Sequence, residues 1–71
     1  MTLFSQLYPA ITRWIEEDGL IEIGTNEYSP SLARAYDIDG IVWESRPEHK
    51  TVDDALSAMD AALQVLFDES E

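Results

Sequence analysis

Apolar side chains recur at steps of three and four residues near both ends of the chain, the spacing of one helix face. Near the N-terminus this pattern predicts a helix over residues 3–18, in which Pro9 either kinks the helix or begins its main part. A second helix is predicted from Thr51, a suitable N-cap with Asp54 three residues later. Its apolar stripe consists of Val52, Leu56, Met59, Leu63 and Leu66. We expect the acidic residues 68–71 to form a frayed tail.

The C-terminal end of the first predicted helix combines a stop signal with unfavourable charge. Gly19 suits the left-handed position that closes many helices. Glu16, Glu17 and Asp18 precede it, where the helix dipole disfavours negative charge. We therefore expect this helix end to fray or to have a basic group nearby, and Arg13 is spaced to reach Glu16 or Glu17 along the helix surface.

Between the two predicted helices the pattern changes to alternation of apolar and polar residues, which is typical of β-strands. It predicts one strand over residues 20–26 and a hairpin over residues 32–38 and 41–46. Within the hairpin, Asp39-Gly40 favours a two-residue turn. We therefore predict a single α+β domain in the order α-β-β-β-α, with a three-stranded antiparallel meander and both helices packed on one face.

Alternation within the hairpin also assigns its two faces, because every second side chain points to the same side. The predicted core-facing residues are Leu32, Tyr36, Ile38, Ile41 and Trp43. The opposite face is then small and mildly apolar with a charged rim, which is typical of the centre of a protein interface. The candidate interface residues are Ala33, Ala35, Val42, Glu44 and Arg46. Exposure of this face to solvent alone is the alternative.

The composition gives the chain a strong negative charge and excludes cysteine-dependent sites. Fifteen acidic residues oppose four basic ones, for a formal net charge of −11. Such a field repels nucleic acids and anionic membranes and attracts basic proteins and cations. The chain has no cysteine, no apolar run of about 20 residues and no signal-peptide pattern. We therefore expect a cytoplasmic protein that binds neither nucleic acid nor membrane.

Acidic pairs and the single histidine are the candidates for catalysis or metal binding. Asp37 and Asp39 precede Gly40, but a calcium loop of EF-hand type needs a third acid and a later glutamate at set positions. His49 lies in a polar connector, where further ligands would have to be acids. The sequence therefore predicts no catalytic residue, no metal, no cofactor and no enzymatic activity.

Arg34 is the basic residue with the most informative position. Alternation places it beside Tyr36 and diagonal to Trp43, at the edge of the predicted core. A guanidinium in that position could bind a carboxylate ligand. We therefore take Arg34, Tyr36 and Trp43 as a candidate ligand-binding site, with a purely structural arginine as the alternative.

Two parts of the chain resemble small hypothetical proteins found largely in cyanobacteria. One is the pair of residues 28–29 together with the run over residues 34–44, and the other is the capped helix start over residues 51–56. The resemblance extends over residues 20–66. It implies a compact α-β-β-β-α unit and no particular activity.

Together, these features predict a small acidic protein-interaction module that binds a protein partner, itself, or both, with a homodimer as its expected state. A second hypothesis is an acidic nucleic-acid mimic that occupies the basic site of a DNA- or RNA-binding protein. A third is a small ligand-binding domain that uses Arg34.

Overall fold

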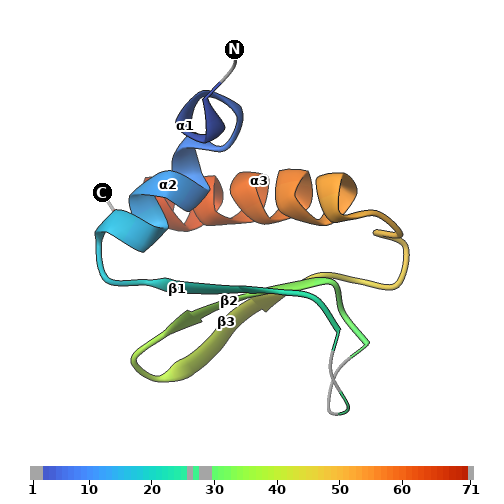
Figure 1. Cartoon of the computed structure of the whole chain (residues 1–71). Coiled ribbons are helices and arrows are strands. Elements are labelled where there is room, and N and C mark those ends of the chain that lie inside the picture. The colour runs from blue at the N-terminus through green and yellow to red at the C-terminus, as the bar shows by residue number, and fades with distance from the viewer. Residues whose placement is uncertain (1–2, 26, 28–29, 71) are drawn as a thin grey trace.

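A computed structural model of the chain describes residues 3–25, 27 and 30–70. Its elements are α1 (Phe4–Leu7), α2 (Pro9–Glu16), β1 (Leu20–Ile23), β2 (Ala33–Asp37), β3 (Gly40–Glu44) and α3 (Val52–Ser70). The strands form one antiparallel sheet in the order β1-β2-β3, and α2 and α3 lie over the same face of it (Figure 1). The predicted α+β fold with a three-stranded meander is therefore confirmed.

Pro9 begins α2 instead of kinking a continuous helix. Tyr8, which separates the two helices, has a non-helical φ of −133° and ψ of 67°. Proline suits the first helical position because its missing N–H group would have no partner there. The N–H groups of Ala10 and Ile11 donate to Oδ1 of Asp60 on α3, at 2.9 and 3.0 Å. A single carboxylate of α3 therefore caps α2 and ties the two helices together.

The short helix α1 projects from α2 away from the sheet (Figure 1). The rings of Phe4 and Tyr8 lie 5.0 Å apart between centroids. Leu3, Phe4 and Leu7 remain exposed to solvent. This turn of helix therefore contributes no side chain to the buried core.

The left-handed residue after α2 is Asp18, with a φ of 72°, and not the predicted Gly19. A short polar side chain tolerates this conformation better than most. Gly19 serves a different purpose, because a Cβ atom there would lie 2.4 Å from Nε1 of Trp14. Its N–H group donates to the carbonyl of Trp14 at 2.8 Å. Glycine at this position therefore lets the chain pass closely against the indole ring.

The β2–β3 turn lies one residue earlier than predicted. Asp37 pairs with Gly40, so that Ile38 and Asp39 form the turn. Oδ1 of Asp37 accepts a hydrogen bond from the N–H group of Asp39 at 2.7 Å. Ile38 is 99% exposed, whereas the sequence analysis placed it in the core. The side chain of Asp37 thus closes the turn locally.

The pairing of β2 with β3 shifts register within the hairpin. Tyr36 pairs with Ile41, but the next residue, Ala35, pairs with Trp43. Val42 is the additional residue at this irregularity. An extra residue on one strand reverses the facing of all side chains beyond it. Alternation alone therefore could not relate the two ends of this hairpin.

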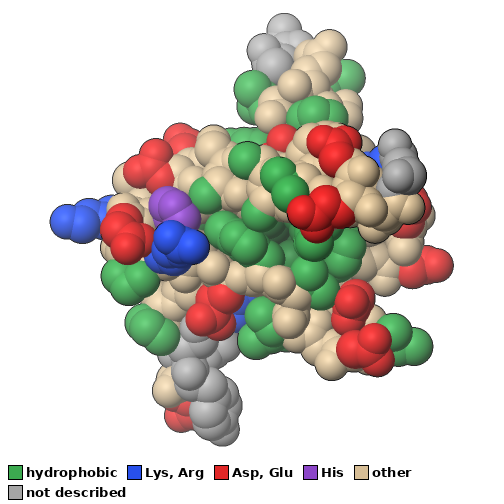
Figure 2. Space-filling view, turned by 180° about the vertical axis from the view of Figure 1, so that it is seen from behind, with side chains coloured by type: hydrophobic (Ala, Val, Ile, Leu, Met, Phe, Trp, Pro, Cys, Tyr) green, Lys and Arg blue, Asp and Glu red, His purple; other side chains and the backbone are tan. Residues whose placement is uncertain are grey.

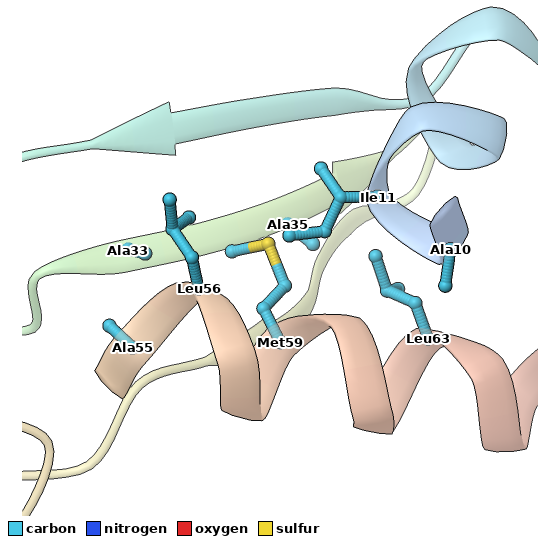
Figure 3. Close-up of a cluster of buried hydrophobic side chains, with 8 residues drawn as sticks. All are labelled: Ala10, Ile11, Ala33, Ala35, Ala55, Leu56, Met59 and Leu63. Atoms are coloured by element: carbon cyan, nitrogen blue, oxygen red, sulfur yellow. The ribbon is translucent and has the colours of Figure 1, made fainter. Parts of the chain in front are cut away.

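The predicted faces of β2 are wrong as a result. Ala33 and Ala35 were predicted to face outward, but they have no exposed surface and lie against the helices (Figure 3). Tyr36 and Ile41 were predicted to face inward, but they lie on the side away from the helices. Trp43 does pack against the core as predicted. Small residues occupy the inner face of β2 because helix side chains fill the space above it.

The core lies between α2, α3 and β2. Figure 3 shows Leu56 and Met59 pointing from α3 toward β2, with Ile11 of α2 over the same strand. Large side chains from the helices therefore meet alanines on the strand, which allows the layers to approach closely. The buried cluster consists of Ala10, Ile11, Ala33, Ala35, Ala55, Leu56, Met59 and Leu63.

The C-terminal helix begins as predicted and ends later. The N–H group of Asp54 donates to Oγ1 of Thr51 at 3.1 Å, which confirms the predicted cap. The helix continues to Ser70, although a frayed tail was predicted from Asp68. Nε2 of Gln64 donates to Oδ1 of Asp68 at 3.1 Å across one turn, which supports this last segment. None of the described helices is both long and apolar enough to cross a membrane.

Candidate interaction surface

None of the helices formed by the described residues covers the face of the sheet that is turned away from α2 and α3 (Figure 1). We call this face the outer sheet face. Residues that pair directly across neighbouring strands point to the same side, so they form rows across it. The apolar row consists of Leu20, Tyr36 and Ile41. The charged row consists of Glu22, Arg34 and Glu44.

Arg34 is the centre of the charged row and is only 2% exposed. Its Nε and Nη2 atoms contact Oε1 of Glu22 at 2.7 and 2.6 Å. Nη1 donates to the carbonyl and to Oγ of Ser31, both at 2.8 Å, and Nη2 donates to the carbonyl of Gly24. All five N–H groups of the guanidinium therefore have acceptors inside the protein.

These contacts make Arg34 a structural cation. Its acceptors at Gly24 and Ser31 belong to the connection between β1 and β2, which the guanidinium fixes to the outer sheet face. Burial is the largest single effect and disfavours the charged form, but Glu22 and Tyr36 together outweigh it, so the pKa of Arg34 is raised above its ordinary value. A carboxylate ligand would have to displace one of these internal acceptors.

The apolar row is open to solvent at both of its ends. Leu20 is 57% exposed and Ile41 is 55% exposed. Tyr36 lies between them, half-buried, and its hydroxyl donates to Oε1 of Glu22 at 3.4 Å. This weak bond links the apolar row to the charged row. The outer sheet face therefore presents an apolar strip with carboxylates along one side.

The structure separates the three predicted ligand-binding residues. Arg34 and Tyr36 share the outer sheet face, but their polar groups are directed at Glu22. Trp43 lies on the inner face, and its ring centroid is 6.2 Å from that of His49 at an interplanar angle of 30°. No open pocket is therefore formed by Arg34, Tyr36 and Trp43 together.

The predicted interface residues are also dispersed. Ala33 and Ala35 are buried in the core, so they are not available for contact with a partner. Val42 is half-buried at the register shift, and Glu44 belongs to the charged row. Arg46 is exposed in the connector after β3. Only Glu44 of this group therefore lies on the outer sheet face as defined here.

Sequence reasoning missed the buried polar residues that organise the strands. Oγ of Ser45 accepts hydrogen bonds from the N–H groups of Leu32 and Ala33 at 2.9 and 3.2 Å. Ser45 is buried just beyond β3, where it satisfies backbone groups at the start of β2. Its two-residue spacing from Trp43 was the available signal, because alternation places both on the same side.

Within residues 3–25, 27 and 30–70, no group of three or more histidine, aspartate or glutamate side chains is arranged to hold a metal ion. Neither does any buried side-chain nitrogen or oxygen atom of this part of the chain lack a hydrogen-bond partner. The described residues therefore offer no orphaned polar atom that would mark a ligand position.

The chain matches no protein-family model, no curated protein and no solved structure. The resemblance to small cyanobacterial proteins therefore stays a prediction. Function has to be inferred from the surfaces of the molecule itself.

Proposed function

We propose that this chain is a non-enzymatic protein-interaction module whose outer sheet face binds a protein partner. The observation that carries the proposal is the apolar row, in which Leu20 and Ile41 are more than half exposed on either side of Tyr36. Single exposed apolar residues are normal, whereas a contiguous group with a polar border is typical of interaction sites. A small domain gains from burying such a row against a partner.

Charge favours a basic partner over a second copy of the chain. The charged row contains two carboxylates and one guanidinium, and the whole chain has a net charge of −11. Two outer sheet faces would bring like charges together, which opposes association. A partner with an apolar centre and lysine or arginine at its border would be complementary. The proposed partner is therefore a basic protein, and the predicted homodimer is the competing possibility.

Affinity capture with matched variants tests the surface. Wild type, Leu20→Thr/Ile41→Thr and Val65→Thr serve as baits in extract of the native cell, because Val65 is an exposed apolar residue on α3. Threonine preserves β-propensity on the strands. A protein retained by wild type and by Val65→Thr, but not by the double variant, is then purified and titrated directly. We expect its affinity for the double variant to fall at least about tenfold, or 1.4 kcal/mol.

The same titration at rising salt concentration tests the charge argument, since exposed ion pairs are screened. Binding that is equal for the double variant and Val65→Thr would reject the outer sheet face as the site. Light scattering of the pure chain tests the homodimer. We expect a particle of 8.0 kDa at high micromolar concentration. A particle of twice this mass, lost in the double variant, would make a second copy the partner.

A further inference from the structure

An open pocket of about 370 Å³ lies at one end of the molecule, where α2 ends, β2 turns into β3 and α3 approaches its C-terminus. We call it the end pocket. Trp14 and Phe67 supply its aromatic walls, and Ile38 contributes an aliphatic one. Glu17, Asp18 and Asp37 supply its carboxylates. None of these residues belongs to the two rows of the outer sheet face, so the end pocket is a separate site.

The aromatic walls of the end pocket contact each other and the neighbouring backbone. The rings of Trp14 and Phe67 lie 6.2 Å apart at an interplanar angle of 60°. Nε1 of Trp14 donates to the carbonyl of Tyr36 at 3.2 Å, which fixes the indole against β2. The backbone at Gly19 passes directly against the same ring. The two aromatic walls are therefore positioned before any ligand enters, which lowers the entropic cost of binding.

The electrostatic field at this end of the molecule is negative. The three segments that meet there, residues 13–18, 37–39 and 67–69, contain Arg13 as their one basic residue. The carboxyl ends of α2 and α3 add the negative ends of their dipoles. Figure 2 shows red acidic side chains over both ends of the molecule, whereas the purple histidine and most of the visible blue side chains lie at one end only. The acids of the three segments are Glu16, Glu17, Asp18, Asp37, Asp39, Asp68 and Glu69.

Arg13 shows how a cation is bound in this environment. Its guanidinium carbon lies 4.0 Å from the centroid of the Phe67 ring. Its Nε atom also pairs with Oε2 of Glu17, which confirms one of the two predicted pairings. The combination of an aromatic face and a carboxylate is the arrangement that recognises organic cations. The chain thus already uses two walls of the end pocket for this chemistry.

We propose that the end pocket binds an ammonium group carried on an aliphatic stem. The stem would lie against Trp14, Phe67 and Ile38, and the ammonium would be held by Asp18 and Asp37. A bare metal ion is a poorer fit, because hard cations need six or more converging oxygen ligands and no aromatic walls. A lysine side chain of a protein and a free polyamine share the required chemistry.

The two tryptophans provide an internal comparison for a binding test. Trp14 lines the end pocket, whereas Trp43 lies beside His49. In a ¹⁵N-labelled sample of the full chain, the indole N–H signals of Trp14 and Trp43 are followed during titration, with Trp43→Phe to assign them. The probes are N-acetyl-lysine methylamide, its uncharged isostere N-acetyl-norleucine methylamide, and spermidine. They are added to roughly 20 mM, since a few exposed charge contacts give millimolar affinity.

We expect a saturable shift of the Trp14 signal with the lysine probe, no saturable shift with the norleucine probe, and a constant Trp43 signal. Tighter binding of spermidine would support the same site and identify a free polyamine as the source of the bound ammonium group. Tighter binding of the lysine probe would identify a protein side chain as that source. Equal shifts of both indoles, or a linear response without saturation, would overturn the proposal.

Two isosteric substitutions test the carboxylates without disturbing the backbone. Asn suits the left-handed conformation at position 18, and Asn at position 37 keeps an oxygen that accepts the hydrogen bond from the N–H group of Asp39. The control, Glu48→Gln/Asp53→Asn, removes the same charge from the connector before α3 and from the first turn of α3. We expect Asp18→Asn/Asp37→Asn to weaken binding at least tenfold and the control to change it less than twofold.

Equal weakening by both double variants would show a general charge effect and would reject the end pocket. Phe67→Leu provides a further test, because it removes a ring but no charge. We expect it to lower the affinity for the lysine probe at least threefold. An unchanged affinity would also contradict the proposal. The outer sheet face is intact in all of these variants, so failure here leaves the proposed function standing.

Discussion

The two faces of the sheet differ in both side-chain size and chemistry. On β2 the inner face carries Ala33 and Ala35, while the outer face carries Arg34 and Tyr36. The inner alanines are completely buried although they are small, because the helices above them supply the large side chains. The outer residues are large although no helix covers them. The size of a side chain on this strand therefore depends on which groups pack over it, and not simply on whether it is buried.

The difference extends to the forces involved. The inner face is stabilised by removal of apolar surface from water and by close packing with α3. The outer face is organised by directed hydrogen bonds, since the guanidinium of Arg34 joins Glu22, Gly24 and Ser31. Loss of volume should therefore be most damaging on the inner face, and loss of donors most damaging on the outer one.

The largest effect is expected from a cavity under the inner face. Leu63 is fully buried on α3, so Leu63→Ala should lower the free energy of unfolding by about 2–5 kcal/mol. Ile41→Ala removes an aliphatic side chain from the outer sheet face and should cost less than about 1 kcal/mol. Urea unfolding followed by circular dichroism measures both. Comparable losses in the two variants would mean that the faces do not differ as described.

The next effect concerns the donors of the outer face. Arg34→Met keeps the length of the side chain but leaves the carbonyls of Gly24 and Ser31 without their donor. We expect a loss of about 1–3 kcal/mol, because buried acceptors without partners are costly. Arg34→Lys retains the charge with fewer directed bonds and should lie between Arg34→Met and wild type. A variant Arg34→Met as stable as wild type would show that this cluster does not stabilise the fold.

Local chemistry predicted the elements of this fold well. The hydroxyl of Thr51 acts within a few residues of itself, so the start of α3 can be read from the sequence. For Pro9 the sequence left a kink and a helix start open, and the structure shows the helix start. The antiparallel meander followed from three strands that are consecutive along the chain. These features need no knowledge of the tertiary structure.

The faces and the surface sites depended on contacts that sequence spacing does not contain. The register shift between Ala35 and Tyr36 reversed the alternation, so the predicted interface lost its two alanines to the core. Arg34 was recognised as unusual, but its acceptors at Gly24 and Ser31 are set by how the connection folds back. The end pocket joins residues from three separate segments, which only the packed structure brings together.

A smaller effect tests how the helix layer is held over the inner face. Asp60→Ala removes the acceptor for the N–H groups of Ala10 and Ile11 and should cost about 0.5–2 kcal/mol. Asp60→Asn keeps an oxygen and should cost less. Asp68→Ala, on the exposed end of the same helix, is the control and should change stability by less than about 0.5 kcal/mol. Thermal unfolding of the three variants would refute the inter-helix cap if Asp60→Ala matched Asp68→Ala.

The smallest expected effect is the change with pH in the contribution of Arg34 to the free energy of unfolding. The pKa of Arg34 is raised in the folded protein, because Glu22 and Tyr36 together outweigh the cost of burial. A cation whose pKa is raised by folding stabilises the fold fully below its unfolded-state pKa. This stabilisation is lost only as the pH rises through its folded-state pKa. Arginine titrates above about pH 12 even when unfolded.

The difference in unfolding free energy between wild type and Arg34→Met should therefore stay constant from about pH 6 to about pH 9. Urea unfolding of both proteins at several pH values in that range measures it. A difference that shrinks toward high pH would mean that burial outweighs Glu22 and Tyr36 and lowers the pKa of Arg34. The outer sheet face would then owe its order to packing, as the inner face does, and the contrast between the two faces would fail.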